Sequence, residues 1–482
     1  MASGYEIVIG LEIHVQLLTD SKIFCACSTK FGAEPNSQVC PVCSGMPGAL
    51  PVLNKKALEY IVKAGLALNC NINKHTTFAR KNYFYPDLPK GYQISQFDYP
   101  VCENGYLEIM TENNEIKKIG IQRIHLEEDA GKSLHPEKDN LITESYIDLN
   151  RCGVPLIEIV TKPDIRSPQE AYNFLKLLRQ TILYLGISDV NMEEGSLRCD
   201  ANISLRKIGE TKFGTKTELK NMNSFHGVLR ALEYEAKRQE AILDAGGIIE
   251  QQTLLWDDAR GEARPMRSKE EAHDYRYFPD PDLVRVELDD EFINGIKNTL
   301  PELPREKFLR FKNEYGLNDY SADLLTSTPE YAEYFEKAVS VYKNPEKIAN
   351  WIMGDLTRIV KETKQEINKL YITPEMIAKL VKIVDDGVIN TKIAKDVFNK
   401  MAETGLNPEE IIEKFGLKQV TDVRAIEEII NKVLADNPKE VEAYKGGKEK
   451  ILGFFVGQVM KLSKGKANPQ IVNKILKEKL SN

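Results

Sequence analysis

The sequence lacks several features that would place it in a specialised class of proteins. No apolar run approaches the roughly 20 residues that a membrane-spanning helix needs, and no basic leader precedes an apolar stretch at the start. Eight cysteines in 482 residues are too few for a disulfide framework, and the last residues contain no prenylation cysteine. We therefore expect a cytoplasmic protein without membrane contact. The length suggests two or three domains, on a prior of one domain per roughly 150 residues.

The common nucleotide-binding and hydrolase motifs are also missing. The sequence contains no G-x-G-x-x-G, no H-E-x-x-H and no G-x-S-x-G pattern. The segment Ala130-Gly131-Lys132-Ser133 ends like a phosphate-binding loop, but Leu126 stands where that motif requires its first glycine. If the protein uses ATP, the fold that holds it is therefore an uncommon one.

Charge is distributed unevenly along the chain. The net charge is −7, from 65 basic and 72 acidic residues, which argues against a surface that binds nucleic acid everywhere. From Tyr444 to the end, however, nine lysines face two glutamates. This balance of +7 is typical either of a tail that binds a polyanion or of a solvated helical face.

The first 293 residues combine strand and helix signals. Residues 5–17 alternate apolar and polar side chains, which is the period of a β-strand. Further strands are predicted at 119–129, 145–150, 155–161, 196–206 and 215–221. Asn54 is placed to cap a helix that reaches about Leu68, and Ser167-Pro168-Gln169-Glu170 is typical of a capping box, with Gly186 ending that helix. The pattern predicts an α+β domain over residues 1–293.

Beyond a proline-containing linker near residue 300, only helical periodicity remains. Thr373-Pro374-Glu375 marks one helix start, and Asn407-Pro408-Glu409-Glu410 marks another after Gly405. We therefore predict an all-helical middle domain over 294–406 and a helical tail over 407–482.

Four cysteines cluster early in the chain. Cys25 and Cys27 are followed, after twelve residues, by Cys40 and Cys43 in a C-P-x-C-x-G turn. Two such pairs across a short loop are typical of a closed tetrahedral zinc site, which stabilises a loop and leaves no position open for catalysis. A redox pair is the alternative, but Pro47 and Pro51 disfavour the helix that such a motif usually begins.

Acidic residues on separate strands suggest a second kind of metal site. Glu12 and His14 share the face of their strand opposite the isoleucines, and Arg123, His125, Glu127 and Asp129 share one face of another. Glu158 interrupts an otherwise apolar strand, where an unpaired buried carboxylate would cost several kcal/mol. Mg²⁺ would satisfy several of these oxygens at once, and an imidazole would also admit Mn²⁺. Solvent-facing residues or local salt bridges are the simpler alternative.

Two further stretches mix polar and aromatic side chains. Residues 80–87, with Arg80, Lys81, Tyr83 and Tyr85, have a composition suited to stacking a base or binding phosphate, or to a packed aromatic corner. Polar groups are also dense in residues 193–202 and in Lys220-Asn221. Such stretches are typical of either a binding site or a hydrogen-bonded turn.

These motifs together resemble the B subunits of aspartyl/glutamyl-tRNA amidotransferases. The resemblance rests on stretches that run in order along nearly the whole chain: V-I-G-L-E-I-H at 8–14, residues 80–87, E-E-D-A-G-K at 127–132, D-L-N-R at 148–151, residues 193–204, D-Y-R-Y-F-P at 274–279 and G-F-F-V-G-Q at 453–458. The C-terminal stretch also resembles the YqeY-like domain.

The resemblance implies a ligase that works as a heterotrimer. The amidase (A) subunit would release ammonia from glutamine and pass it through a channel, with a small C subunit beside it. The B subunit would use ATP and Mg²⁺ to phosphorylate the side-chain carboxyl of Glu-tRNA(Gln) or Asp-tRNA(Asn), and ammonia would then displace phosphate. It also implies a cradle domain that holds this site, and helical and tail domains that bind tRNA.

The resemblance also assigns roles to individual residues. Glu12, His14, Glu127 and Glu158 match the family's Mg²⁺ motifs, and the four cysteines match members with a zinc knuckle. We add Arg198 and Lys220 as groups that stabilise phosphate charge. The predicted nucleotide contacts are Arg80, Lys81, Tyr83 and Tyr85. In the tail, Lys461, Lys464 and Lys466 are predicted to contact tRNA phosphates. A tRNA-binding scaffold without catalysis, and a metal-dependent phosphatase or nuclease, are the competing hypotheses.

Overall fold

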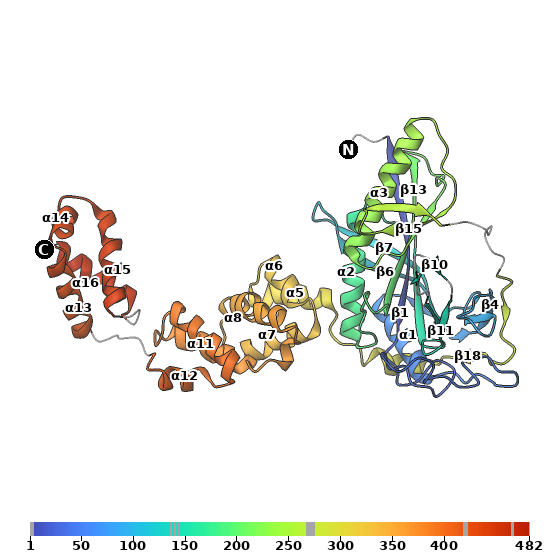
Figure 1. The fold of residues 1–482 in the computed structure, drawn as a ribbon, viewed down its shortest axis with the longest axis horizontal. Helices are drawn as coiled ribbons and strands as arrows, with labels where there is room; N and C mark the ends of the chain where they lie inside the picture. The colour runs from blue at the N-terminus through green and yellow to red at the C-terminus, as the bar shows by residue number, and fades with distance from the viewer. Residues whose placement is uncertain are drawn as a thin grey trace. The chain divides into compact units, whose positions relative to one another are not determined.

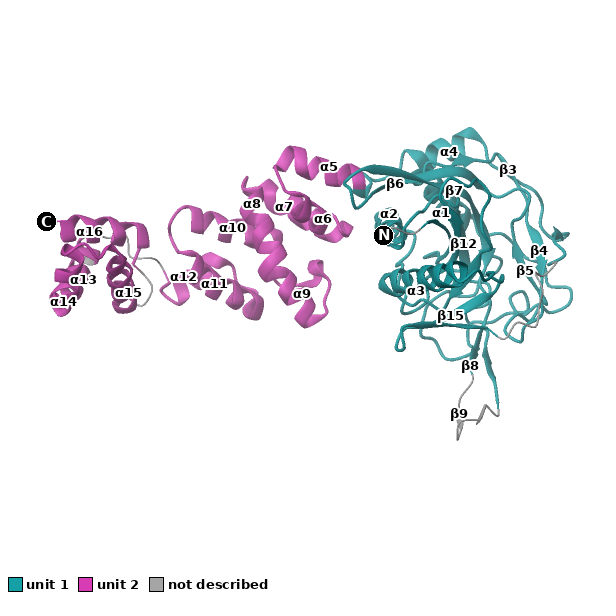
Figure 2. Ribbon diagram, turned by 90° about the horizontal axis from the view of Figure 1, so that it is seen from above, with its two compact units in different colours: residues 1–304 teal, residues 305–482 magenta. Residues whose placement is uncertain are grey.

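The computed structural model describes residues 4–134, 137–138, 141–142, 144–266, 275–417, 423–463 and 467–481. The chain divides into two compact units, Met1–Pro304 and Arg305–Asn482 (Figure 2), and each is described by itself. Within these ranges, unit 1 contains the strands and four helices, whereas unit 2 is helical throughout (Figure 1). This arrangement confirms the predicted α+β class with helical regions after the sheet domain.

A nine-stranded sheet is the centre of unit 1. Its strands, in spatial order, are β16 (Glu262–Pro265), β15 (Thr253–Asp257), β14 (Thr217–Lys220), β13 (Leu197–Lys207), β1 (Tyr5–Gln16), β12 (Pro155–Thr161), β7 (Ile116–Glu128), β6 (Cys102–Met110) and β2 (Asn71–Ile72). All neighbours are antiparallel except β14 and β15, which are parallel. Five of the six predicted strands lie in this sheet, whereas the one predicted at 145–150 forms β11, which pairs with β8 in a separate two-stranded sheet.

One face of the sheet is apolar and covered by helices. Ile9, Ile13 and Val15 of β1 pack in one core with side chains of α1 (Lys55–Ala67), α2 (Pro168–Leu185) and α3 (Phe225–Asp244). In Figure 2 these helices lie on one side of the large sheet and the strands β4 and β5 on the other. Because side chains alternate along a strand, the polar residues of β1 face away from this core.

The helix boundaries follow the predicted caps. The Asn54 side chain accepts a hydrogen bond from the Lys56 backbone, and α2 begins after Ser167 and ends at Gly186 in the left-handed conformation, φ 65°. The predicted capping box at Ser167 is only half right. Ser167 Oγ accepts from the Glu170 backbone, but the Glu170 carboxylate accepts from the backbone N–H of Arg166 rather than from that of Ser167.

Short strands and one helix complete unit 1. They are β3 (His75–Thr76), β4 (Ala79–Asn82), β5 (Tyr92–Ser95), β8 (Lys132–Leu134), β9 (Glu137–Lys138), β10 (Leu141–Ile142), β11 (Tyr146–Asp148), β17 (Phe278–Pro279), β18 (Val286–Glu287) and α4 (Asp290–Lys297). The β17–β4–β5 sheet brings the end of the unit back beside residues 79–95.

Unit 2 is built from helices. They are α5 (Pro304–Tyr315), α6 (Asp319–Leu325), α7 (Pro329–Val341), α8 (Pro345–Trp351), a π-helical turn (Ile352–Leu356), α9 (Thr357–Thr363), a 3₁₀ turn (Ile367–Lys369), α10 (Pro374–Asp385), α11 (Thr391–Thr404), α12 (Pro408–Lys414), α13 (Val423–Asp436), α14 (Pro438–Lys445), a second 3₁₀ turn (Glu449–Ile451), α15 (Leu452–Leu462) and α16 (Pro469–Ser481). The predicted helix starts after Thr373 and Asn407 are confirmed, the latter with a complete capping box.

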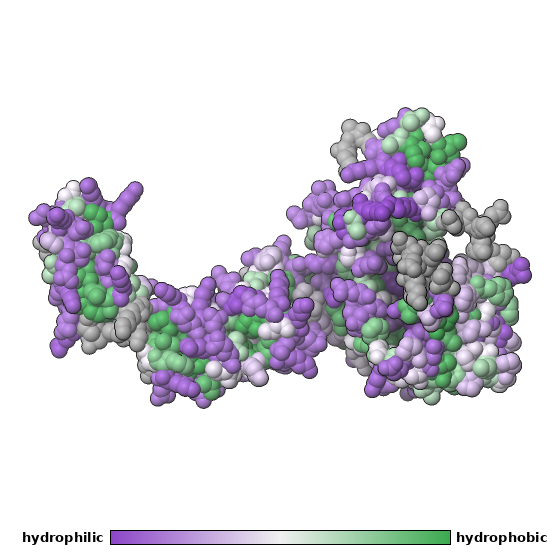
Figure 3. Space-filling view, in the orientation of Figure 1, coloured by the Kyte–Doolittle hydropathy of each residue, from purple (hydrophilic) through white to green (hydrophobic). Residues whose placement is uncertain are grey.

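The tail has a core of its own. Buried side chains of α13, α15 and α16 form one cluster that includes Phe455, Val459 and Leu476, whereas α12 contacts α10 and α11. The three-domain division at 293/294 and 406/407 stays a prediction. Within the described ranges, no helix combines the length and apolar character needed to cross a membrane. Hydrophilic side chains cover much of the visible face of both units in Figure 3, interrupted by hydrophobic patches.

Candidate functional site

The strand register gathers the polar faces of four central strands into rows. On β1, His14 lies opposite Glu158 of β12 and opposite Arg198 of β13. Glu158 in turn lies opposite His125 of β7. Directly opposed residues of antiparallel strands have Cβ atoms about 5 Å apart. Four polar residues from strands far apart in the sequence therefore form one row across the sheet.

Three of these side chains converge tightly enough to bind one cation. Donor atoms of His14, Glu127 and Glu158 all lie within 4.8 Å of one another. His14 Nε2 is 3.5 Å from Glu127 Oε1 and 3.5 Å from Glu158 Oε2. Two carboxylates and one imidazole suit Mg²⁺ or Mn²⁺, so the donor set fits the predicted metal. Three of the four predicted ligands are therefore brought together.

A second histidine adjoins the same carboxylates. His125 Nε2 lies 3.3 Å from Glu158 Oε2 and 3.7 Å from Glu127 Oε2. Burial acts to lower the pKa of His125, but the Coulombic attraction of Glu158 and a hydrogen bond to Glu127 raise it to about 9. Burial likewise acts to raise the pKa of Glu158, yet the charge and hydrogen bond of His125 hold it well below its ordinary value. Imidazolium charge thus compensates two buried carboxylates.

Glu12 lies on the same face but outside this trio. It is opposite Asp200 of β13, and its Oε1 accepts a hydrogen bond from Asn202 Nδ2 at 3.0 Å. Burial, and then repulsion from Glu158, Glu218 and Asp200, raise the pKa of Glu12. Sequence reasoning included Asp200 only within the polar stretch 193–202, without a role of its own, and did not name Glu218, although the alternation of Arg198, Asp200 and Asn202 on one strand was visible.

The two cations predicted to stabilise phosphate both line the site and both have acidic partners. Arg198 Nη2 is 2.9 Å from Asp129 Oδ2. Lys220 Nζ is 3.0 Å from Asp200 Oδ2 and 3.2 Å from Glu218 Oε1. Burial acts to lower the pKa of Lys220, but Asp200 and Glu218 raise it above its ordinary value. The ammonium group therefore stays charged next to the acidic row.

The predicted nucleotide-contact segment is split between two environments. Lys81 and Tyr83 line the site, with Lys81 Nζ 4.8 Å from the ring centre of Tyr275. Arg80, the neighbour of Lys81 on β4, instead forms ion pairs with Asp280 and Asp282 at 2.8 and 2.7 Å. Tyr85 is 60% exposed and does not line the cavity. Of the four predicted nucleotide contacts, the structure thus brings only Lys81 and Tyr83 to the acidic site.

Together these residues enclose a polar cavity of about 400 Å³. Its floor is the polar face of the sheet, and its far wall is the segment 81–97 with Tyr275 and Tyr277. Phe97 stacks on Tyr277, with ring centres 4.2 Å apart. Sequence reasoning did not assign Phe97, Tyr275 or Tyr277 to the site, because only the pairing of β17 with β4 brings residues 275–279 here.

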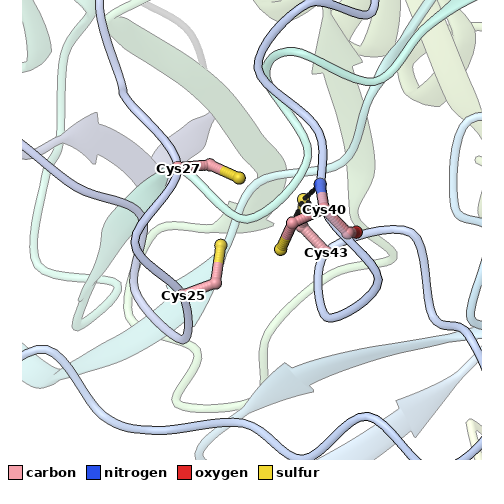
Figure 4. A group of neighbouring side chains, drawn as sticks. All are labelled: Cys25, Cys27, Cys40 and Cys43. Carbon is pink, nitrogen blue, oxygen red and sulfur yellow. Dashed lines mark hydrogen bonds between the residues drawn. The ribbon is translucent and has the colours of Figure 1, made fainter.

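The four predicted cysteine ligands form a separate site. Figure 4 shows Cys25 and Cys27 on one loop facing Cys40 and Cys43 on another, and the four sulfur atoms lie within 4.8 Å of one another. A hydrogen bond from Cys25 lowers the pKa of Cys43 to about 4, with help from a backbone N–H and the charge of Lys22. Because thiolates are the form that binds zinc, this cluster could hold a metal such as zinc.

A buried lysine joins the cysteine site to the strand that carries Glu158. Lys22 is fully buried, and its Nζ lies 3.5 Å from Cys43 Sγ, 2.7 Å from the Gln38 carbonyl oxygen and 3.3 Å from that of Leu149. Cys152 Sγ also donates to the Cys43 carbonyl at 3.2 Å. The cysteine loops are thereby fixed against residues 149–153, directly before β12.

In the tail, only one of the three predicted tRNA contacts can be placed. Lys461 is exposed on α15. Lys464 and Lys466 lie outside the described residues, as does Asp274 at the start of the D-Y-R-Y-F-P motif.

Comparison with known proteins places this site in a family. The family model described as "GatB/GatE catalytic domain" matches residues 7–294, and that described as "GatB domain" matches residues 333–480. The chain belongs to the GatB family. Every described residue of the acidic site and all four cysteines fall within the first match, and α13, α15 and all of α16 but its last residue fall within the second.

Close relatives share almost the whole chain. Proteins named as the B subunit of aspartyl/glutamyl-tRNA(Asn/Gln) amidotransferase, from Thermoanaerobacter pseudethanolicus and Thermodesulfovibrio yellowstonii, are 57% and 56% identical to it over 477 and 478 residues. These alignments cover 99% and 98% of this chain and 99% and 100% of the relatives. A relative of the same name from Syntrophotalea carbinolica is 54% identical over 481 residues, covering 100% of both chains. The GatB resemblance expected from the motifs is therefore confirmed.

Proposed function

We propose that this protein is the B subunit of a tRNA-dependent amidotransferase, a ligase that converts Glu-tRNA(Gln) or Asp-tRNA(Asn) to the amide. The proposal is supported by the family and by the polar cavity in which His14, Glu127 and Glu158 converge. In this cavity the side-chain carboxyl of the misacylated tRNA would be phosphorylated by ATP and then amidated. The enzyme would act in the cytoplasm, where tRNA is charged.

The composition of the cavity suits phosphoryl transfer to a carboxylate. A carboxylate resists attack by ammonia because oxide is a poor leaving group, whereas an acyl phosphate releases phosphate. Phosphoryl transfer depends mainly on positioning and charge neutralisation. Mg²⁺ held by His14, Glu127 and Glu158 would supply this neutralisation. Arg198 and Lys220 would add positive charge at the wall, where Asp129 and Asp200 hold them in place.

The aromatic wall of the cavity suits the nucleotide. Lys81 is held beside the rings of Tyr83 and Tyr275, and the charges of Glu127 and Glu158 raise its pKa against the effect of burial. An ammonium group beside aromatic rings is suited to a phosphate chain joined to a base. Arg80, which is bound to Asp280 and Asp282, would support this wall from behind rather than touch ATP.

The remaining parts of the reaction would come from partners. We propose that an amidase, the A subunit, supplies ammonia from glutamine through a channel and that a small C subunit completes the heterotrimer. The lysine-rich tail would bind the tRNA phosphates without reading bases, so binding should weaken as salt rises. The cysteine site would hold Zn²⁺ in a structural role, since four sulfur ligands leave no open position.

The decisive experiment uses the heterotrimer purified with both partner chains. ADP release and amide formation are measured with Glu-tRNA(Gln) and with Asp-tRNA(Asn), each compared with uncharged tRNA. The proposal predicts ADP release that depends on a misacylated tRNA and on Mg²⁺, and the comparison of the two substrates shows which of them the enzyme accepts. Absence of such ADP release would favour the alternative of a tRNA-binding scaffold without catalysis. Cleavage of the tRNA would instead indicate a nuclease.

A further inference from the structure

Arg123 stands apart from the other basic residues of the cavity. Lys81 is held beside aromatic rings, and Arg198 and Lys220 are bound to carboxylates. Arg123 also lines the cavity, yet it forms no ion pair with any residue in the described part of the chain. Its charge is therefore available to a ligand.

Hydrogen-bonding capacity points the same way. Only four buried side-chain polar atoms among the described residues lack a hydrogen-bond partner, and three of them belong to residues that line this cavity: Arg123 Nε, His125 Nδ1 and Arg198 Nε. Arginine Nε is a donor without acceptor capacity. Leaving a buried donor without a partner is unfavourable, so two unsatisfied guanidinium donors in one cavity indicate a ligand that supplies acceptor oxygens.

The neighbours of Arg123 explain why it has no protein partner. Across the sheet it lies opposite Val160, whose other neighbour is Glu12. At about 4.8 Å per strand, the backbones of Glu12 and Arg123 are therefore roughly 10 Å apart. On the other side Arg123 lies opposite Glu103, whose carboxylate accepts a hydrogen bond from Asn73 at 2.9 Å. Val160, which stands between Glu12 and Arg123 in this row, carries no acceptor group, so the guanidinium has no carboxylate directly beside it on that side.

We propose that Arg123 binds an anionic oxygen group of the substrate, either the side-chain carboxylate of the aminoacyl-tRNA or the transferred phosphoryl group. This inference rests on the proposed function and assigns to one residue the recognition of the reacting anion. The planar guanidinium donates two parallel hydrogen bonds to a carboxylate or a phosphate, which also fixes the orientation of that group. If the ligand is the side-chain carboxylate of the aminoacyl-tRNA, Arg123 would also discriminate against the amide product, which carries no charge.

The test compares substitutions of Arg123 in the intact heterotrimer. Arg123→Gln removes the charge, and Arg123→Lys keeps the charge but loses the paired donors. Arg230→Gln is the matched control, because Arg230, on α3, pairs with Asp258 and lies outside the cavity. For each variant, kcat and KM are measured separately for ATP and for the misacylated tRNA. Guanidinium at a non-denaturing concentration is added in a second series.

We expect Arg123→Gln to lower kcat/KM by roughly 10²-fold, Arg123→Lys to lower it less, and Arg230→Gln to leave it unchanged. A selective rise in KM for the misacylated tRNA identifies the carboxylate as the ligand, and a selective rise for ATP identifies the phosphoryl group. Recovery of Arg123→Gln by guanidinium, which a purely structural defect would not show, supports the inference as well.

Values of kcat/KM within threefold of wild type for both substrates in Arg123→Gln would overturn the inference while the proposed function stands. If Arg123→Gln fails to assemble, the comparison of Arg123→Lys with wild type decides, because full activity in the lysine variant excludes a paired contact. A wild-type heterotrimer without ADP release on misacylated tRNA would instead refute the function itself.

Discussion

The titration of His125 gives a direct test of the acidic site. Its pKa is raised from 6.5 to about 9 because Glu158 and Glu127 surround the imidazole in a buried setting. We therefore expect His125 to stay protonated through neutral pH in magnesium-free buffer. Saturating Mg²⁺ should lower the midpoint by more than one unit, because a cation on His14, Glu127 and Glu158 replaces the charge of the imidazolium.

Histidine-selective NMR measures this midpoint directly. The sequence contains only six histidines, so a spectrum labelled at histidine carbons has few signals, and His125→Gln assigns the relevant one. His226→Gln is the matched control, since His226 is exposed and contacts Tyr172 outside the cavity. A midpoint below 7.5, or one that Mg²⁺ does not move, would contradict the reasoning about this cluster.

The same shift makes a prediction about stability. A histidine whose pKa is higher in the folded than in the unfolded protein stabilises the fold when the pH lies below its unfolded-state pKa. This stabilisation is lost as the pH rises through its folded-state pKa. The difference between 6.5 and about 9 corresponds to roughly 3 kcal/mol. Magnesium-free protein should therefore lose about this much free energy of unfolding between pH 6.5 and 9.5, and His125→Gln should lose clearly less.

Three further predictions concern other parts of the chain. Glu127→Gln should reduce tRNA-dependent ADP release by at least roughly 10²-fold and leave the glutaminase activity of the heterotrimer unchanged. The control Glu59→Gln, on the outside of α1, should leave both activities unchanged. Normal ADP release in Glu127→Gln would show that Glu127 does not belong to the site. Deleting residues 418–482 should raise the KM for tRNA at physiological salt but not that for ATP, and equal KM values for tRNA would exclude a tRNA-binding tail. Lys22→Met should weaken zinc retention about 10–100-fold, measured by competition with a chromogenic chelator, whereas Lys56→Met should retain zinc like wild type.

Local patterns in the sequence were sufficient for much of the fold. Alternation in residues 5–17 predicted both the strand and the side of it that carries Glu12 and His14, because the period of two is a property of the extended backbone itself. The caps at Asn54 and Thr373 were predicted for the same kind of reason, since the bonds they make span only two or three residues. The spacing of the cysteines likewise limited their site to one pair of neighbouring loops.

Other features depended on contacts that no local pattern encodes. Alternation could not show that Glu158 lies opposite both His14 and His125, because strand order and register are set by packing over the whole sheet. Glu12, which shares a face with His14, was expected in the same metal shell, yet it lies one row away beside Asp200.

By itself, the sequence determined which residues can act: the acids, histidines and cysteines, the face of each strand on which they lie, and the family that carries these motifs. The tertiary structure decided which of them act together. It joined His14, Glu127 and Glu158, separated Lys81 from Arg80, and left Arg123 without a partner in the described chain. The physical reason is distance along the chain. Side-chain alternation is fixed by neighbouring peptide bonds, whereas a site built from four strands exists only after these strands have paired in the correct register.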